Sequence, residues 1–355
     1  MTHFRLTRLE IFLLLAFALA SAAQVAVGIT GPRDKDRGHA NWEQQEREVQ
    51  KEIRETFSGG REEMEARVRR EPGLWLQFQM GFFFLLFLAA GALIQFLRMT
   101  WLVLNGRPFA PALGGPPVAG WGLREILRVV LAAMVVSELA LIAQWGVLRV
   151  FHPAWLDRSV TALANTLVMD LTALAGAGWL LARRSGARPE GKAGAREAVR
   201  FAAGAYLMFL PVLVMALLGV ARVLDAFHLE PAPQPIFTLY LAENRAPILG
   251  WLLVLVTLVG PAAEEIFFRG LVHGWLRGRV GAWVSIGLTA FVFALMHNDI
   301  VAFLPIFLLG LIFGWVYEKT GSLAAPVAIH VLHNGGMLYF ASLMKSLMVI
   351  SGRPG

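Results

Sequence analysis

The sequence predicts an all-α fold, a polytopic transmembrane bundle of about eight to nine membrane helices. Of its 355 residues, 57% are hydrophobic and 16% are charged, whereas soluble domains average roughly 45–50% and about 25%. The apolar residues gather in runs near the ~20 residues that a spanning helix needs. The net charge of +7 lies mainly between these runs, so membrane orientation explains it and no nucleic-acid partner is expected.

The N-terminal region, residues 1–31, contains the apolar run Ile11–Thr30, which we interpret as a retained membrane anchor. It exceeds the about 7–15 residues of a signal-peptide core, although Ala20-Ser-Ala22 resembles a cleavage site and cleavage remains the alternative. Residues 32–73 form a charged insert of mixed sign. It is either a pair of amphipathic helices broken at Ser58-Gly59-Gly60 or a solvated, mobile segment. We assign it no chemistry.

Eight further apolar runs fall into accessory helices in residues 74–247 and a core in residues 248–345. The runs at 282–297 and 301–317 are near the lower length limit, so they could form a hairpin that does not fully cross. The runs are Leu74–Leu97, Ile126–Leu148, Val160–Leu181, Phe201–Ala221, Ile248–Phe268, Ala282–His297, Val301–Tyr317 and Leu323–Ile350.

Basic residues concentrate in alternate loops between these runs. Three of these basic loops would lie on the same side of the membrane. They contain Arg98 with Arg107, the cluster in residues 183–200, and Arg277 with Arg279. The positive-inside rule assigns that side to the cytoplasm. The sequence thus predicts an integral membrane protein with a cytoplasmic N-terminus. We expect the membrane to be the bacterial inner (plasma) membrane.

Glu264, Glu265 and Arg269 interrupt the run that begins at Ile248. A charge near the bilayer centre costs at least ~2.5–3.5 kcal/mol, so such residues usually have partners and a function. Glu265 and Arg269 are i,i+4 neighbours that can pair. Glu264 is rotated about 100° away, so it can face another group and act as a general base. The alternative is an ordinary charged helix end at the cytoplasmic surface.

Two later runs carry histidines. Phe293 and His297 share a helix face, as do His330 and Asn334. Stacked donors such as His330 and Asn334 could hold a developing oxyanion. The structural alternative is hydrogen bonding between helices.

Helical rise allows the polar positions to meet. Counted from a turn at Gly278-Arg-Val-Gly281, Glu264 lies ~21 Å along one helix and His297 ~24 Å along the next. Counted from the following turn, His330 and Asn334 are ~12 Å and ~18 Å deep, a difference that helix tilt can absorb. We therefore expect these residues to converge on one buried cavity. Small residues at 310 and 314, both glycine, would let helices approach closely there.

Three motifs resemble those of the CPBP family of intramembrane endopeptidases. Glu264-Glu-Ile-Phe-Phe-Arg-Gly-Leu271 is similar to EExxxR in its EExxFRGxL form, Phe293–His297 to FxxxH, and His330–Asn334 to HxxxN. Gly321-Ser-Leu-Ala-Ala-Pro326 precedes the third motif, as is usual there. The family includes CAAX prenyl endopeptidases of the Ras-converting type and bacterial bacteriocin-processing or immunity proteins. The resemblance covers residues 248–340.

The resemblance implies a glutamic-type intramembrane endopeptidase, historically classed as a metalloprotease. Its substrate would be a membrane-embedded or lipidated protein or peptide. Glu264 would activate a water with help from His297, while His330 and Asn334 would stabilise the oxyanion. Supporting roles would fall to Glu265, Arg269 and Phe293.

No cofactor is favoured from the residues present. Glu264, His297 and His330 could bind zinc, but no H-E-x-x-H pair lies on one helix, and the Asn334 amide is a poor zinc ligand. The chain has no cysteines, which excludes thiolate catalysis and cysteine-ligated metal.

Two other functions stay open. The chain could be a non-proteolytic membrane scaffold or bacteriocin-immunity protein of the same family, although such a protein would be expected to lose one of the four catalytic positions. It could also be a proton-coupled transporter using Glu264, Asp170 and His297, although transporters more often show repeat symmetry. Asp170 lies within the run Val160–Leu181 and has no role in the motifs.

Overall fold

The computed structural model describes residues 7–30, 39–107, 116, 120–151, 153, 155–184, 194–229 and 234–351. Within these residues the regular secondary structure is entirely helical and contains no strand, so the predicted all-α class is confirmed. Part of the basic cluster in residues 183–200 lies outside the described residues.

Seven helical stretches in the described part of the chain are long and apolar enough to cross a membrane. This confirms the polytopic helical prediction and indicates an integral membrane protein. A further apolar helix, α12 (Ala282–Met296), is shorter, and α1 (Arg8–Thr30) coincides with the first predicted segment. The stretches lie in α4 (Pro72–Leu104), α5 (Leu123–Phe151), α6 (Arg158–Arg184), α7 (Ala195–Ala226), Ala246–Val280, α13 (Phe303–Thr320) and α14 (Ala324–Ser351).

The chain forms two compact units, each built from three separate segments. The first unit holds α1, α5, α6 and the stretch Ala246–Val280, and the second holds α4, α7, α13 and α14. The bounds of the first unit are Met1–Lys35, Pro116–Glu190 and Arg245–Ser285, and those of the second are Asp36–Gly115, Gly191–Asn244 and Ile286–Gly355.

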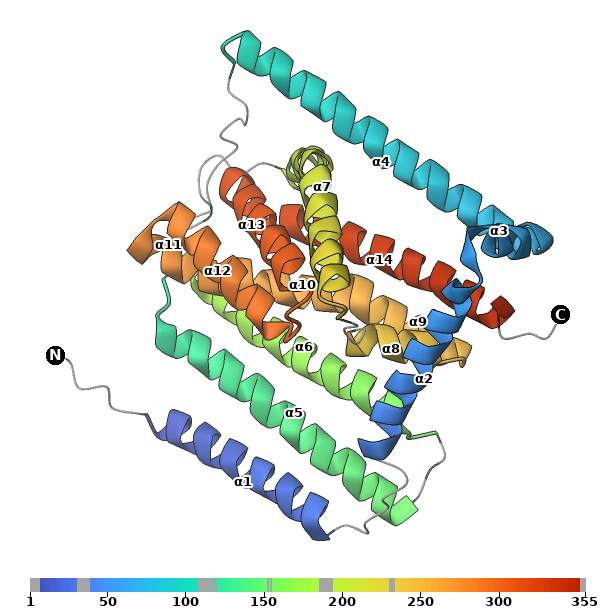
Figure 1. The fold of residues 1–355 in the computed structure, drawn as a ribbon. Coiled ribbons are helices and arrows are strands. Elements are labelled where there is room, and N and C mark those ends of the chain that lie inside the picture. The colour runs from blue at the N-terminus through green and yellow to red at the C-terminus, as the bar shows by residue number, and fades with distance from the viewer. Residues whose placement is uncertain are drawn as a thin grey trace. The chain divides into compact units, whose positions relative to one another are not determined.

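In the first unit, α5 packs against both α1 and α6 (Figure 1). Two salt bridges join α1 to α5, because the Glu10 carboxylate lies 3.1 Å from the side chain of Arg124 and 3.2 Å from that of Arg128. The α6 helix also packs against the stretch Ala246–Val280. Helix α6 is therefore the neighbour that can bring a side chain next to the acidic motif.

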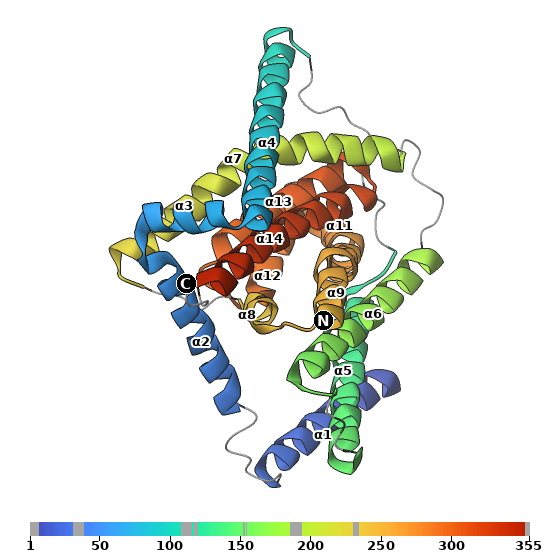
Figure 2. The same ribbon diagram turned by 90° about the vertical axis from the view of Figure 1, so that its right-hand side faces the viewer.

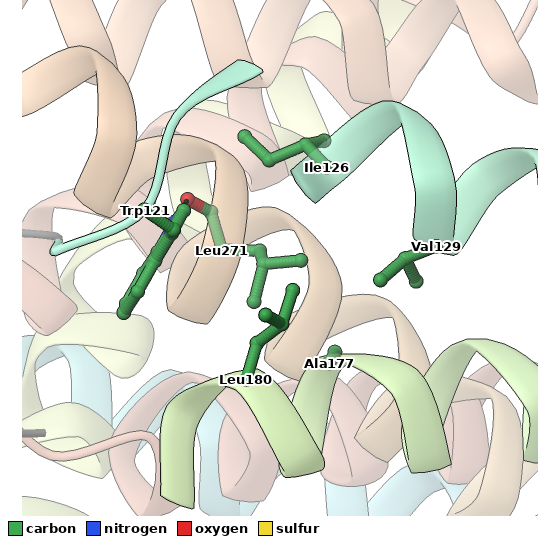
Figure 3. Packing of buried hydrophobic residues seen from close by; sticks show 6 residues of the cluster. All are labelled: Trp121, Ile126, Val129, Ala177, Leu180 and Leu271. Carbon is green, nitrogen blue, oxygen red and sulfur yellow. Dashed lines mark hydrogen bonds between the residues drawn. The ribbon is translucent and has the colours of Figure 1, made fainter. Parts of the chain in front are cut away.

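Leu271 lies at the centre of the apolar core that holds this stretch in place (Figure 3). The Trp121 indole N–H donates a hydrogen bond of 3.0 Å to the carbonyl of Leu271, so the tryptophan satisfies its polar atom while its ring is buried. Ile126 and Val129 of α5, with Ala177 and Leu180 of α6, complete the cluster.

The stretch Ala246–Val280 is a continuous helix that widens twice into π-helical turns. It was expected to be a regular α-helix, and that expectation is wrong. The reason lies partly in Pro261, which has no N–H to donate to the carbonyl of Thr257 one turn earlier. The parts are α9 (Ala246–Val254), η1 (Leu255–Val259), α10 (Gly260–Glu265), η2 (Ile266–His273) and α11 (Gly274–Val280).

The π-helical turns change the depth count made from the sequence. A rise of 1.5 Å per residue applies to an α-helix, and η2 lies between Glu264 and the turn from which its depth was counted. The turn is shorter than predicted, because α11 continues through Gly278 to Val280 and only Gly281, with φ of 80°, separates it from α12. π-Helical turns occur frequently at functional sites.

In the second unit, α14 packs against α4, α7 and α13 (Figure 2). The Tyr339 hydroxyl of α14 donates to the Gln77 carbonyl of α4, and Phe201 of α7 contacts Trp315 of α13 with ring centroids 5.5 Å apart. The first of these contacts joins α4 to α14, which carries the third motif.

The described part of the charged insert, residues 39–73, is largely helical. Helices α2 (His39–Ser58) and α3 (Gly60–Arg70) are separated at the Ser58-Gly59-Gly60 break, where Gly60 has φ of 75°. A further short helix, α8 (Pro235–Ala242), lies outside all the predicted apolar runs. It packs against α2 and α14.

The two predicted small residues of α13 allow a close helix contact. A Cβ at Gly310 would lie 2.9 Å from both Cα and Cβ of Ala290 in α12, and one at Gly314 would lie 3.2 Å from the side chain of Ile286. Only glycine fits at position 310 without moving backbone, so the small-xxx-small prediction is confirmed.

Candidate functional site

Glu265 and Arg269 form the predicted ion pair. The Arg269 Nη1 group donates to Glu265 Oε1 at 2.9 Å, and both side chains have 0% of their surface exposed. The guanidinium carbon also lies 5.8 Å from the ring centroid of Phe268. A pair buried this deeply is costly to break, because the remaining charge would lose its partner in a dry site. It therefore holds the helix around the acidic motif rigid.

Glu264 lies on α10, one residue before Glu265, and its side chain is half-buried. The helical rotation directs it to a different neighbour, as predicted. That neighbour is α6, where Asp170 lies in electrostatic contact with Glu264. The two adjacent glutamates thus have different surroundings, one against Arg269 and the other near a second carboxyl group.

His297 follows the last turn of α12, and its ring is bound to that helix. Its Nδ1 lies 2.8 Å from the Phe293 carbonyl oxygen. A carbonyl can only accept, so Nδ1 must carry the proton. In the neutral ring, Nε2 is then the acceptor, and His297 is an exposed residue. This tautomer suits a group that takes up a proton.

His330 belongs to the second unit, and its ring contacts two phenylalanine rings there. It is 5% exposed, and its ring stacks on Phe313 with centroids 4.8 Å apart. Phe293 contacts both histidines, with ring centroids 4.7 Å from His297 and 5.9 Å from His330. The structure thus brings two of the predicted catalytic side chains onto one phenylalanine, while the supporting role of Phe293 stays a prediction.

Asn334 lies one helical turn after His330 on α14 and is half-buried. Between them, His333 points toward α7, where its Nδ1 lies 3.0 Å from the Tyr206 hydroxyl. Sequence reasoning did not single out Tyr206, which is 4% exposed. The position of Tyr206 within an apolar run could have indicated this contact, because a buried tyrosine hydroxyl needs a hydrogen-bond partner.

The candidate residues therefore fall into two groups. Glu264, Glu265 and Arg269 belong to the first unit. The predicted meeting of Glu264 with the histidines stays a prediction. The second group, which belongs to the second unit, is Phe293, His297, His330 and Asn334.

Zinc was considered because Glu264, His297 and His330 include zinc-ligating side chains. Within the described residues, no three His, Cys, Asp or Glu side chains are grouped so that they could hold a metal ion. The amide at Asn334 adds no good zinc ligand. The metal-free reaction stays a prediction.

Part of the chain is similar to known proteins. Residues 246–336 match the family model described as type II CAAX prenyl endopeptidase Rce1-like. The chain is 36% identical over 95 residues to the membrane-embedded CAAX protease MroQ of Staphylococcus aureus, over 25% of this chain and 38% of that protein. It is 25% identical over 83 residues to the putative membrane peptidase YdiL of Bacillus subtilis, over 23% and 34%.

An uncharacterized 24.3 kDa protein of Escherichia coli is 28% identical over 120 residues, which are 32% of this chain and 52% of that protein. The chain thus spans about a third to a half of the curated relatives it matches. No solved structure gives a significant match. The matched region contains all three motifs, and it confirms the resemblance of residues 246–336 to the CAAX-protease type of intramembrane endopeptidase.

Proposed function

We propose that this protein is an intramembrane endopeptidase that hydrolyses a peptide bond of a membrane-associated protein or peptide. One observation carries the proposal: residues 246–336, which match the endopeptidase family model, contain Glu264, His297, His330 and Asn334 together. A scaffold or immunity protein has no need to keep all four.

In the proposed reaction, Glu264 takes a proton from a water as the water oxygen bonds to the carbonyl carbon of the substrate. His297 assists through Nε2, the nitrogen that its Nδ1 hydrogen bond leaves as the acceptor. The carbonyl π electrons move to oxygen and form an oxyanion. Collapse restores the carbonyl and breaks the C–N bond, and the proton held by Glu264 passes to the leaving amine.

His330 and Asn334 stabilise the oxyanion in this proposal. Each can offer an N–H, and preorganised donors in a site that excludes water stabilise developing charge strongly. The stacking of His330 on Phe313 supports this role, because a ring fixed at 4.8 Å loses little freedom when the oxyanion forms. No metal takes part in the proposed reaction.

The substrate is proposed to be membrane-embedded or lipidated. An apolar cavity of about 210 Å³ in the first unit supports this class, because it could accept an apolar chain. It lies between α6 and the α9–η1 stretch, and it is lined by Val160, Leu163, Ala164, Leu167, Ile248, Trp251, Val254, Leu255 and Val259. We further propose the bacterial inner (plasma) membrane as the location, with a cytoplasmic N-terminus.

The test compares membrane proteomes of cells that carry the wild-type chain, Glu264→Ala or His297→Ala. A substrate should accumulate uncut in both variants and be processed in the wild type. Glu62→Ala and His228→Ala are matched controls, because both side chains are exposed and lie outside the motifs. They should process the substrate normally. Full processing by Glu264→Ala at wild-type protein level would refute the mechanism.

A further inference from the structure

Asp170 is an acidic residue placed where a charge is expensive. It lies near the midpoint of the apolar span Ser159–Arg183, and its neighbours Met169 and Leu171 are 43% and 48% exposed, as lipid-facing side chains would be. An acidic residue at such a depth usually faces a polar interior and has a function. The three motifs give it none.

The surroundings of Gly260 show what Asp170 faces. A Cβ built on Gly260 would have three oxygens around it: the Leu255 carbonyl at 3.1 Å, Asp170 Oδ2 at 3.7 Å and Glu264 Oε1 at 4.0 Å. The two carboxyl groups come from different helices, α6 and α10, which pack against each other. The missing side chain of Gly260 therefore leaves a gap bordered by two carboxyl groups and by the Leu255 carbonyl, which already accepts the Gly260 N–H.

The charged groups of the elements packed around this gap narrow its chemistry. The groups nearest the gap are Asp170 on α6 and Glu264 on α10, and the next ones along the same stretch are Glu265 and Arg269. Arg269 is in a direct 2.9 Å ion pair with Glu265. A cluster of acceptors calls for a donor, and a water supplies two O–H groups to a polar site with two to four partners.

We propose that Asp170 is a positioning residue that orients the Glu264 carboxyl group through a water that both bind over Gly260. This inference rests on the proposed function of Glu264 as the base. It goes beyond the three motifs, because it assigns α6 a role in the reaction. Misplacing a catalytic group by about 1 Å can cost about 10²-fold in rate, so the orientation of Glu264 has a measurable effect.

The first test does not depend on a substrate. Infrared spectra of the purified full chain in detergent are recorded for the wild type and Glu264→Gln, and their difference identifies the carboxyl band of Glu264. That band should shift in Asp170→Leu and in Gly260→Ala, whose methyl group would fill the gap. Asp170→Asn keeps a polar group of the same shape and should shift it less.

The matched control is Asn165→Leu on the same helix, because Asn165 is bonded to Ser137 of α5 at 3.0 Å. It should leave the Glu264 band in place. An unshifted band in folded Asp170→Leu would overturn the proposal. If that variant does not fold, an unshifted band in both Asp170→Asn and Gly260→Ala would overturn it.

The second test uses the protein that accumulates uncut with Glu264→Ala. Asp170→Leu should lower kcat for this protein about tenfold or more with KM unchanged, and Asp170→Asn should recover most of the rate. A purely structural role would instead reduce the amount of folded protein and leave kcat per folded molecule unchanged. If Glu264→Ala is inactive and folded Asp170→Leu has wild-type kcat, only the role of Asp170 fails. If Glu264→Ala is fully active, the proposed function fails. The infrared band of Glu264 still tests whether Asp170 and Glu264 interact over Gly260.

Discussion

Arg269 donates a hydrogen bond of 2.9 Å to Glu265 from a position where neither side chain has any exposed surface. The two residues lie on one continuous helix, across the boundary between α10 and η2. Because Arg269 neutralises the charge of Glu265, the two adjacent glutamates have different partners, and Glu264 faces Asp170 of α6. The stability of the acidic motif therefore depends on the arginine at position 269.

Removing Arg269 should destabilise the protein strongly. We expect Arg269→Met to lower the free energy of unfolding by about 3–5 kcal/mol, because Glu265 is left as a buried charge without its ion-pair partner. Unfolding midpoints in detergent measure the effect. Arg279→Met is the matched control on α11, where the arginine is exposed and bonded to the Trp275 carbonyl, and it should change stability by about 0.5 kcal/mol or less.

Replacing both members of the ion pair should be milder than removing one. Glu265→Leu/Arg269→Met leaves no buried charge, so most of the lost stability should return. A double variant as unstable as the sum of the two single variants would show that the pair itself contributes little coupling.

Phe293 should matter for activity because its ring lies against both histidines. Phe293→Leu keeps an apolar side chain but removes the ring contacts with His297 and His330. We expect kcat for the accumulated substrate to fall about tenfold or more, with a smaller effect on KM. Phe291→Leu, an exposed residue on the same helix, should retain the wild-type rate. Equal rates for the two variants would argue against this role of Phe293.

The close contact of α13 with α12 should not tolerate a methyl group. Gly310→Ala places Cβ 2.9 Å from the Cα of Ala290, and the backbone must move, at a cost of about 1–3 kcal/mol. Gly287→Ala on α12 meets nothing within 4 Å and should be neutral or stabilising by about 0.5–1 kcal/mol, because alanine favours helix. Thermal unfolding of both variants measures the difference. Equal midpoints would mean that the contact is looser than described.

Chelation tests the absence of a metal from the proposed reaction. Dialysis of the purified protein against a zinc chelator should leave the cleavage rate unchanged, because in the proposed reaction Glu264 and His297 activate the water without a metal. Metal analysis of the same samples provides the control for complete removal. A loss of activity that added zinc restores would overturn the metal-free reaction.

Local features of this protein could be predicted from sequence because their causes are local. The apolar runs indicate the membrane-spanning helices, since every backbone polar group in lipid must be satisfied within the segment. The spacing of Glu265 and Arg269 predicts their pairing, because residues four apart share a helix face. The glycines at positions 59 and 60 mark the break between α2 and α3 for an equally local reason.

The side chains that surround the motif residues could not be predicted from the sequence. Nothing near His330 in the sequence indicates that Phe313 stacks on it, or that Phe293 contacts it together with His297. These contacts join helices whose packing depends on side-chain shape across many residues.

The sequence by itself determined the membrane class, the three motifs and the ion pair, because helical periodicity and hydrophobicity act over a few turns. Only the tertiary structure decided that Asp170 lies beside Glu264 across Gly260. The physical reason is that this placement depends on how α6 and the stretch Ala246–Val280 pack. Which helices pack together depends on the shapes of their surfaces, and residue spacing within one helix does not determine it.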